Sequence, residues 1–144
     1  MELIKINNLS KSFGDKAVHR DVSFSVKKGE CLGLLGGSGT GKSIILRSII
    51  GLEKIDSGSI FINGVDTTKF NERELIGVRR KVAYAFQGGA LFDSMTVFDN
   101  LAYPLREHTK LTESEISVKV LKTLNDFSLK GNENILPASL SGGM

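Results

Sequence analysis

Hydrophobic and polar residues alternate along two segments near the start of the chain, residues 3–9 and 22–26, in the pattern of half-buried β-strands. Residues 10–15 between them carry one aromatic side chain and are expected to form a turn. Residues 31–35 are a continuous apolar run, Cys-Leu-Gly-Leu-Leu, and this run predicts a buried strand.

Two more strands and two helices are expected in the next part of the chain. Residues 59–64 form a strand that ends in an Asn-Gly turn signal, and residues 81–86 form a strand that follows a short helix over 72–80. The helix that starts near Lys42 is apolar on most faces. We therefore expect it to lie buried against a sheet, with Gly51 as its C-cap.

Two threonines in the second half of the chain are spaced from an acidic residue as helix caps are. Thr96 and Asp99 precede an apolar stretch that runs to Pro104, and Thr112 and Glu115 begin an amphipathic helix. One face of that helix is predicted to pack in a core, through Ile116, Val120, Leu121, Leu124 and Phe127.

Composition limits the classes of function. The chain has 144 residues, with 40% hydrophobic and 24% charged, as expected for one soluble domain with a core. A net charge of +3 without a long basic block argues against nucleic acid as a partner. Cys31, the single cysteine, is expected to be buried and fits the reducing cytoplasm. No signal peptide or apolar run of about 20 residues is present, so a membrane connection is expected to come through a partner.

A glycine-rich segment between the apolar run and the first helix carries the clearest chemistry. It fits the phosphate-binding pattern G-x-x-x-x-G-K-[ST], with a predicted strand before it and a helix after it. Glycines expose backbone N–H groups to phosphate oxygens, the lysine reaches the β- and γ-phosphates, and the serine hydroxyl completes the shell of Mg²⁺. The alternative is a turn without a ligand, but both flanks favour a nucleotide site. That site consists of Gly36, Gly37, Ser38, Gly39, Thr40, Gly41, Lys42 and Ser43.

Four landmarks follow one another in order: Phe13, the glycine-rich loop, Gln87 at the end of a predicted strand, and Leu-Ser-Gly-Gly-Met at 140–144. Together they resemble the ATP-binding subunit of an ABC transporter over the whole chain. The resemblance implies an α/β P-loop NTPase fold of the ABC ATPase type, with a RecA-like core, an antiparallel β-subdomain and part of a helical subdomain. It also implies the N-terminal portion of a nucleotide-binding domain, divided into 1–87 and 88–144.

The resemblance gives each landmark a role. Phe13 would stack on adenine, although an ordinary surface or core phenylalanine is the alternative. Gln87 would sense Mg²⁺ and the attacking water, and the loop after it would contact an integral-membrane permease; a polar strand end is the alternative. Ser141, Gly142 and Gly143 would act in trans on the γ-phosphate held by a second ATPase subunit, in a head-to-tail homodimer.

The segment over 86–109 narrows the resemblance. With its Pro-Leu-Arg-Glu-His-Thr run at 104–109, it is similar to the ATPases of Mla-type (Mce-associated) phospholipid transporters. Those transporters maintain lipid asymmetry in the outer membrane of Gram-negative bacteria. The similarity implies a cytoplasmic subunit, peripheral on the inner face of the bacterial inner membrane. The ATPase of an amino-acid importer is the rival subfamily.

The implied activity is hydrolysis of ATP with Mg²⁺, in which Lys42, Gln87 and Ser141 are the catalytic groups and Ser43 and Gln87 lie at the metal. Gly37 departs from the family, since many members carry proline there. The sequence also stops at Leu-Ser-Gly-Gly-Met (140–144), which matches the family's signature motif, so the family's Mg²⁺-associated Asp, catalytic Glu and switch His are not among the 144 residues. We therefore expect a piece of a longer ATPase, which alone hydrolyses ATP at a negligible rate and exposes apolar sheet surface.

Other functions stay open at this point. His19 and His108, the only histidines, do not fall where the switch His would lie. A non-catalytic nucleotide-binding module needs only the residues present. A soluble P-loop enzyme such as a nucleotide kinase would leave 140–144 unexplained. An ABC protein acting on DNA or ribosomes would normally carry a second cassette or a basic surface, and neither is visible.

Overall fold

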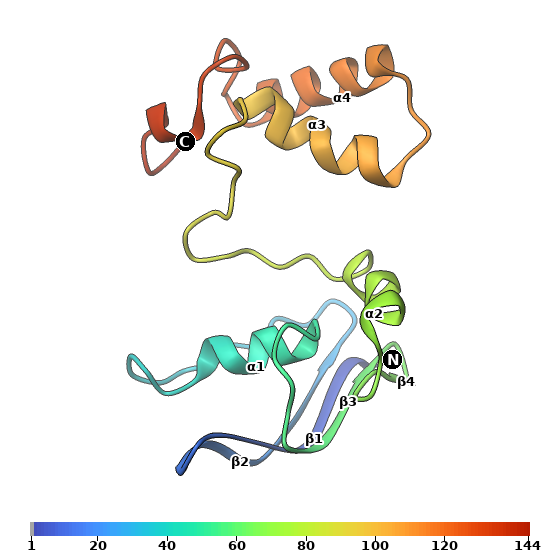
Figure 1. The fold of residues 1–144 in the computed structure, drawn as a ribbon, viewed down its shortest axis with the longest axis vertical. Helices are drawn as coiled ribbons and strands as arrows, with labels where there is room; N and C mark the ends of the chain where they lie inside the picture. The colour runs from blue at the N-terminus through green and yellow to red at the C-terminus, as the bar shows by residue number, and fades with distance from the viewer. Residues whose placement is uncertain (1) are drawn as a thin grey trace. The chain divides into compact units, whose positions relative to one another are not determined.

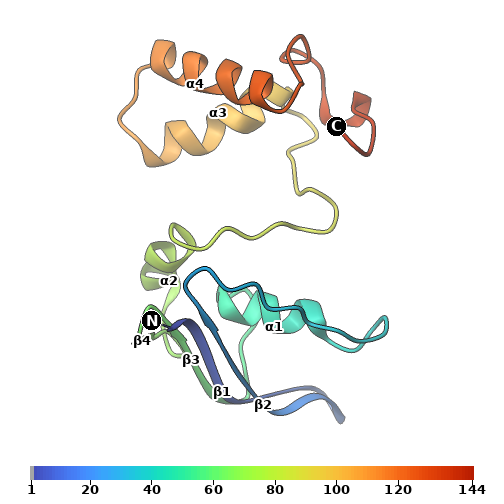
Figure 2. The same ribbon diagram turned by 180° about the vertical axis from the view of Figure 1, so that it is seen from behind.

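The computed structural model describes residues 2–144, and these residues form two compact units (Figures 1 and 2). The first unit ends at Tyr84, and the second runs from Ala85 to Met144. Each unit has a hydrophobic core of its own. The predicted division after residue 87, between an ATP-binding core and part of a helical subdomain, stays a prediction.

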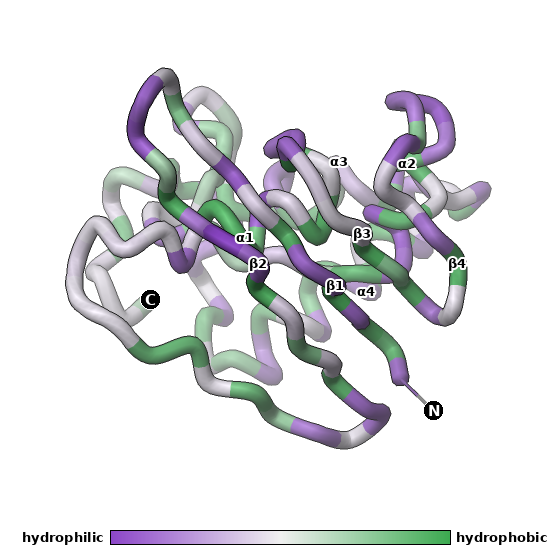
Figure 3. Tube along the Cα trace, turned by 90° about the horizontal axis from the view of Figure 1, so that it is seen from below, coloured by the Kyte–Doolittle hydropathy of each residue, from purple (hydrophilic) through white to green (hydrophobic). Residues whose placement is uncertain are grey.

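A four-stranded antiparallel sheet is the framework of the first unit. Its strands are β1 (Glu2–Phe13), β2 (Lys16–Lys27), β3 (Ser57–Ile62) and β4 (Val65–Asp66). They lie in the order β2-β1-β3-β4, with Ile6 of β1 between Phe24 of β2 and Ile60 of β3. Figure 3 shows hydrophobic and hydrophilic residues interspersed along the strands, so the sheet can offer one face to the core.

The first two strands are longer than the alternation predicts. The turn predicted before β2 is wrong for residues 10–13, which belong to β1, and is formed only by residues 14–15. The pairing with β2 shifts register between Ile6 and Leu9, where Asn8 has a φ of 48°. A bulge changes the face that the following side chains occupy, so the period-two pattern ends before the strand does.

Helix α1 (Lys42–Ile49) packs on the sheet through one face only. Ile45 and Ile49 are buried together with Ile6 and Ile60 of the sheet, whereas Leu46 is 43% exposed. The prediction that the helix is buried on most faces is therefore wrong for its outer side.

Helix α1 ends next to Gly51, as predicted. Ile50 is the C-cap, and Gly51 after it has a φ of 69°, a conformation that glycine adopts without strain. The N–H of Gly51 donates to the Ser48 carbonyl at 3.0 Å, and the N–H of Leu52 donates to the Arg47 carbonyl at 2.9 Å. This pair of bonds is a Schellman motif, which satisfies carbonyls at the helix end.

Helix α2 (Glu72–Arg79) confirms the helix predicted over 72–80. Asn71 caps its start by accepting two backbone N–H groups, and the Glu74 carboxylate accepts the Asn71 N–H at 2.8 Å. Arg79 Nε donates to the Ile50 carbonyl at 3.0 Å, so the last turn of α2 is bound to the end of α1.

Two predicted strands are not formed. Residues 31–35 and 81–86 are not strands in the part of the chain that the structure describes. Cys31 is exposed, contrary to the prediction, and Leu35 is 97% exposed. A strand needs a neighbour that satisfies its backbone N–H and C=O groups, so an apolar run alone does not make one.

The second unit is built on two helices that lie side by side, α3 (Val97–His108) and α4 (Glu113–Asp126) (Figures 1 and 2). A 3₁₀ helix, η1 (Pro137–Ser139), follows them. No helix within residues 2–144 is both long enough and apolar enough to span a bilayer. The buried residues of this unit are Val97, Ala102, Ile116, Val120 and Leu124.

The predicted stripe on α4 is confirmed for its three residues spaced four apart, which are those buried in this core. Leu121 and Phe127 are 44% and 74% exposed, so the prediction is wrong for these two. Leu121 follows Val120 by one residue and is therefore rotated by about 100° from the line of the other three. Phe127 is the C-cap and lies beyond the last residue of α4.

Both helices start where the sequence predicts. The Thr96 hydroxyl accepts the N–H of Asp99 at 3.1 Å. Thr112 accepts the N–H of Glu115 at 3.3 Å, and the Glu115 carboxylate accepts the Thr112 N–H at 2.8 Å, which completes a capping box.

Helix α3 continues past Pro104, the residue to which the apolar stretch runs. Leu105 packs against the core, and Arg106 forms ion pairs with Asp99 at 3.1 Å and with Glu113 of α4 at 2.8 Å. These contacts hold the last turn although proline removes one helical hydrogen bond.

Candidate phosphate-binding site

The glycine-rich loop folds back on itself before α1. Thr40 Oγ1 donates to the Gly37 carbonyl at 2.9 Å. Gly41 has a φ of 91°, and a Cβ placed on it would lie 2.6 Å from Nε2 of His19 and closer still to Val18. Backbone conformation and space therefore both require glycine at this position.

Lys42 holds its ammonium over this loop. Its Nζ donates to the carbonyls of Gly36 at 2.8 Å and Gly37 at 2.6 Å, and lies 3.5 Å from Thr40 Oγ1. The positive charge of Lys42 therefore lies next to the backbone of the glycine-rich loop. A lysine in this position presents a charged donor to an incoming phosphate oxygen.

The start of α1 differs from that of the other three α-helices. Gly41 is its N-cap and supplies no side-chain bond, and no acidic residue lies in the first turn. The N–H groups of Lys42 and Ser43 find no hydrogen-bond acceptor within residues 2–144. By contrast α2, α3 and α4 are each capped by a side chain and carry acidic residues in the first turn. Free N–H groups and a positive dipole end make the start of α1 suited to an anion.

His19 is a residue of this site that no sequence pattern indicates. It is buried at the side of β2, outside the segment predicted as a strand, and its Nε2–H donates to the Gly41 carbonyl at 3.0 Å. The same carbonyl accepts two backbone N–H groups of the first turn of α1. The ring also lines a cavity of about 320 Å³ together with Lys42. His19 thus connects the sheet to the phosphate loop.

Phe13 lies at the end of β1 and is 48% exposed. The Nζ of Lys11 lies 4.7 Å from the centre of its ring, over one face, and also pairs with Glu53 at 2.8 Å. A cation over one face of a ring fixes its orientation. The exposure is suitable for stacking, and the predicted contact with adenine stays a prediction.

The predicted Mg²⁺ ligands have suitable oxygen atoms. Ser43 is exposed in the first turn of α1, and Gln87 is exposed in a turn of the second unit. Hydroxyl and amide oxygens suit Mg²⁺, which usually keeps waters and substrate phosphates in its shell. Within residues 2–144 no three His, Cys, Asp or Glu side chains are grouped to hold a metal. The contact of Ser43 and Gln87 with Mg²⁺ stays a prediction.

The signature segment ends the second unit in an exposed turn. The N–H of Met144 donates to the Ser141 carbonyl at 2.9 Å, and Gly142 and Gly143 form the turn between them. The action of these residues in trans stays a prediction.

Comparison with known proteins adds a family and a fold. The family model described as ABC transporter matches residues 19–144. A solved dimeric ATP-binding cassette in a post-hydrolysis state, bound to ADP and Pi, superposes with a TM-score of 0.86 at 28% identity. The superposition covers 96% of this chain and 63% of the cassette.

Three curated relatives match almost the whole chain. The probable ribonucleotide transport ATP-binding protein mkl of Mycobacterium tuberculosis is 47% identical over 141 residues, which are 98% of this chain and 39% of the relative. The intermembrane phospholipid transport ATP-binding protein MlaF of Haemophilus influenzae is 39% identical over 142 residues, 99% of this chain and 54% of the relative. The methionine import ATP-binding protein MetN of Chlamydia pneumoniae is 42% identical over 146 residues, 98% of this chain and 42% of the relative. The chain thus spans roughly two fifths to one half of these relatives.

Proposed function

The chain belongs to the ABC transporter family and has the fold of its ATPase cassettes, and we propose that it binds ATP with Mg²⁺ as the N-terminal portion of a nucleotide-binding domain. The observation that carries the proposal is the Lys42 ammonium held over a glycine-rich loop at the uncapped start of α1. Residues 1–87 form the ATP-binding core and β-subdomain in this proposal, and residues 88–144 form the loop after Gln87 (the Q-loop) and part of the helical subdomain.

Each group of the loop has a separate task. The N–H groups of residues 36–43 and the Lys42 ammonium bind phosphate oxygens. The Ser43 hydroxyl and the Gln87 amide oxygen hold Mg²⁺, whose charge screens the phosphates during transfer. Phe13 supplies an aromatic face for the adenine ring.

Hydrolysis is proposed for the whole subunit, in a head-to-tail pair of ATPase subunits. Ser141, Gly142 and Gly143 of one subunit contribute a hydroxyl and backbone donors to the γ-phosphate bound by the other, where negative charge develops. The dimeric state of the similar cassette and its ADP and Pi support this arrangement. The 144-residue chain by itself is proposed to bind ATP without appreciable turnover.

The transported substrate is proposed to be phospholipid, moved to maintain the asymmetry of an outer membrane. The resemblance of residues 104–109 to Mla-type ATPases supports this, and so does the MlaF relative. The MetN relative supports an amino-acid importer as the second candidate. Complementation separates them: the full-length subunit would restore lipid asymmetry to a strain without its Mla-type ATPase, and restored methionine uptake alone would favour the importer.

A membrane permease is proposed to bind the loop after Gln87, which places the subunit in the cytoplasm at the inner membrane. Leu91 and Phe92 are 47% and 51% exposed, and the Phe92 ring packs edge-on against Tyr103 at 5.3 Å. A double variant, Leu91→Asp with Phe92→Asp, should abolish transport by the full-length subunit and leave its affinity for ATP unchanged. Transport at the wild-type rate would reject this contact.

Binding of MgATP to wild type and Lys42→Ala, measured by calorimetry, tests the nucleotide proposal. Loss of a charged donor to phosphate should weaken affinity by about 100-fold. Lys28→Ala removes an equal charge from an exposed turn and should bind as wild type does. Equal affinities of wild type and Lys42→Ala would contradict the proposal.

A further inference from the structure

Lys11 is a buried cation beside the aromatic ring that the proposed function assigns to adenine. It lies on β1, two residues before Phe13, and is 8% exposed. A lysine ammonium is rarely buried unless other groups of the protein replace the water that it loses. The groups around Lys11 therefore determine where its charge is held.

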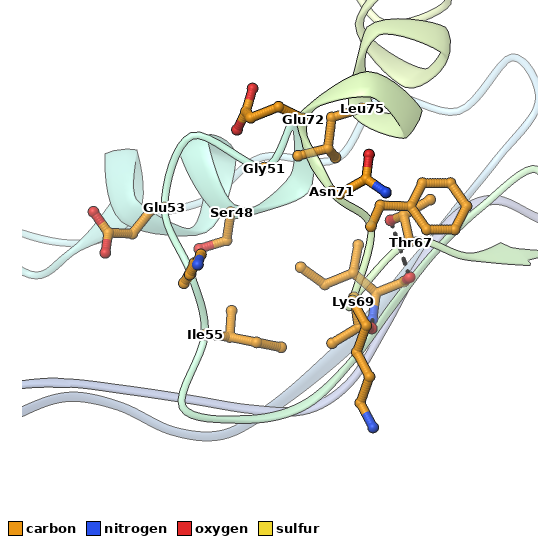
Figure 4. Close-up of a pocket in the computed structure, with 13 residues that line it drawn as sticks. Ser48, Gly51, Glu53, Ile55, Thr67, Lys69, Asn71, Glu72 and Leu75 are labelled. Atoms are coloured by element: carbon orange, nitrogen blue, oxygen red, sulfur yellow. Dashed lines mark hydrogen bonds between the residues drawn. The ribbon is translucent and has the colours of Figure 1, made fainter.

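Two oxygen atoms from the segment after α1 bind the ammonium of Lys11. Its Nζ donates to the Lys54 carbonyl at 2.7 Å and forms an ion pair with Glu53 at 2.8 Å. Glu53 also belongs to the lining of a cavity of about 490 Å³ in the first unit, but Figure 4 shows its carboxylate directed away from the other labelled side chains. This direction agrees with its pairing with Lys11, which is not part of that lining.

The same segment is bound to β1 on both sides of Lys11. The N–H of Asp56 donates to the Ser10 carbonyl at 2.9 Å, and the Asp56 carboxylate accepts the N–H of Ser12 at 2.6 Å. The other carboxylate oxygen of Asp56 lies 3.8 Å from Lys11 Nζ. The ammonium is thus fixed before a ligand arrives, so little of the free energy of binding is needed to order it.

The remaining contact of the ammonium is with the Phe13 ring. An ammonium has three N–H groups, and Lys54 and Glu53 use two of them. Nζ lies 4.7 Å from the ring centre, within the limit of about 6 Å for a cation–π contact. The ring is nevertheless 48% exposed. Because the ammonium lies over one face, a planar base can stack only on the opposite face.

Strand β2 connects this ring to the glycine-rich loop within the first unit. Lys11 pairs with His19 in the ladder between β1 and β2. His19 in turn donates to the Gly41 carbonyl at 3.0 Å, at the start of α1. A ring whose orientation is fixed on this pair of strands is therefore also positioned relative to the loop proposed to bind phosphate.

We infer that Lys11 is a positioning residue for the nucleotide base: it holds one face of the Phe13 ring so that the base stacks on the other. The inference rests on the proposed function, because it concerns the same bound nucleotide. It assigns to Lys11 an effect on the base and none on the phosphates. A residue that only stabilised β1 would affect both parts of the nucleotide.

Calorimetry with two ligands, MgATP and magnesium tripolyphosphate, separates these roles. Lys11→Met keeps the length of the side chain and removes its charge, so it should weaken MgATP binding about threefold to fivefold and leave tripolyphosphate binding unchanged. Lys11→Arg, which keeps a cation, should recover most of the affinity for MgATP. Lys5→Met, at an exposed position of the same strand, should change neither affinity.

Equal weakening of both ligands in Lys11→Met, or wild-type affinity for MgATP, would overturn the inference and leave the proposed function intact. Failure of the wild-type protein to bind either ligand would instead reject the proposed function, and the inference with it.

Nuclear Overhauser effects in the wild-type protein test the geometry without a substitution, so the result does not depend on whether Lys11→Met folds. At saturation with MgATP, protons of the adenine base should show these effects to the Phe13 ring, and the effects between the Lys11 side chain and the ring should persist. Their loss on binding would show that base and ammonium compete for one face, and it would overturn the inference.

Discussion

The first backbone N–H groups of α1 and of α4 have no acceptor within their own helix, and the two helix starts differ in whether a side chain caps them. At α4, Thr112 and Glu115 close a capping box, and two acidic residues lie in the first turn. At α1, a glycine stands at the cap, acidic residues are absent from the first turn, and a lysine lies beside the loop. The helix that lacks a cap is the one whose N–H groups are available to bind a ligand.

The comparison also shows what replaces a cap. A side-chain cap stabilises a helix by about 1 kcal/mol, and α1 forgoes this contribution. Its first turn is held instead from outside, by His19 on the Gly41 carbonyl and by close packing around Gly41. Substitutions at the start of α1 should therefore change nucleotide binding, whereas substitutions at the start of α4 should change stability alone.

The largest effect is expected from Gly41→Ala. The added methyl group would meet Val18 and His19, and alanine is strained at a φ of 91°. We expect a loss of about 2–3 kcal/mol in the free energy of unfolding of the first unit, measured by urea denaturation, and no measurable ATP binding.

Gly37→Ala is the matched control, because a Cβ there would meet only Thr40 Cγ2, at 4.0 Å. It should change the free energy of unfolding by less than about 1 kcal/mol. Equal losses in the two variants would contradict the special role of Gly41.

Thr112→Ala is expected to act on the second unit alone. It removes the hydroxyl that accepts the Glu115 N–H, so the free energy of unfolding should fall by about 1 kcal/mol. Affinity for MgATP should equal that of wild type. Weaker nucleotide binding in this variant would show that the two helix starts do not have separate tasks.

His19→Phe tests the hydrogen bond that connects β2 to the start of α1. It keeps a buried ring but removes the donor to Gly41, and it should weaken MgATP binding by about fivefold. His19→Gln, which keeps an N–H donor, should recover part of the affinity. If both variants bind as wild type does, His19 does not position the loop.

The smallest effect is the acid sensitivity of the α3–α4 pair. The Thr96 hydroxyl and the Arg106 guanidinium lower the pKa of Asp99, and Arg106 lowers the pKa of Glu113. A lowered folded pKa gives stability that is present above the unfolded value, near 4, and is lost as the pH falls through the folded value. The urea concentration at the unfolding midpoint should therefore decrease as the pH is lowered below about 4. This decrease should be less steep in Arg106→Gln. An identical pH dependence in both proteins would rule out this contribution.

Most of the correct predictions concern interactions between residues that are close in sequence. The caps at Thr96 and Thr112, the end of α1 at Gly51 and the buried positions 116, 120 and 124 depend on neighbours within a few residues, so the sequence alone indicates them. The family and fold also followed from motifs in order.

Several of the errors come from contacts that are distant in sequence. Whether 31–35 becomes a strand depends on neighbours that no local pattern contains. The bulge at Asn8 concealed the true length of β1, and the contact of His19 with Gly41 joins residues 22 positions apart. The candidate site was thus predictable as a motif, but the residue that supports it from the sheet was not.

The most direct test of the central claim is an amide NMR titration of the wild-type protein with MgATP, comparing the starts of α1 and α4. We expect large, saturable shifts for the N–H groups of residues 36–43 and none for residues 113–115. Shifts of equal size at both helix starts, or none at residues 36–43, would contradict that claim.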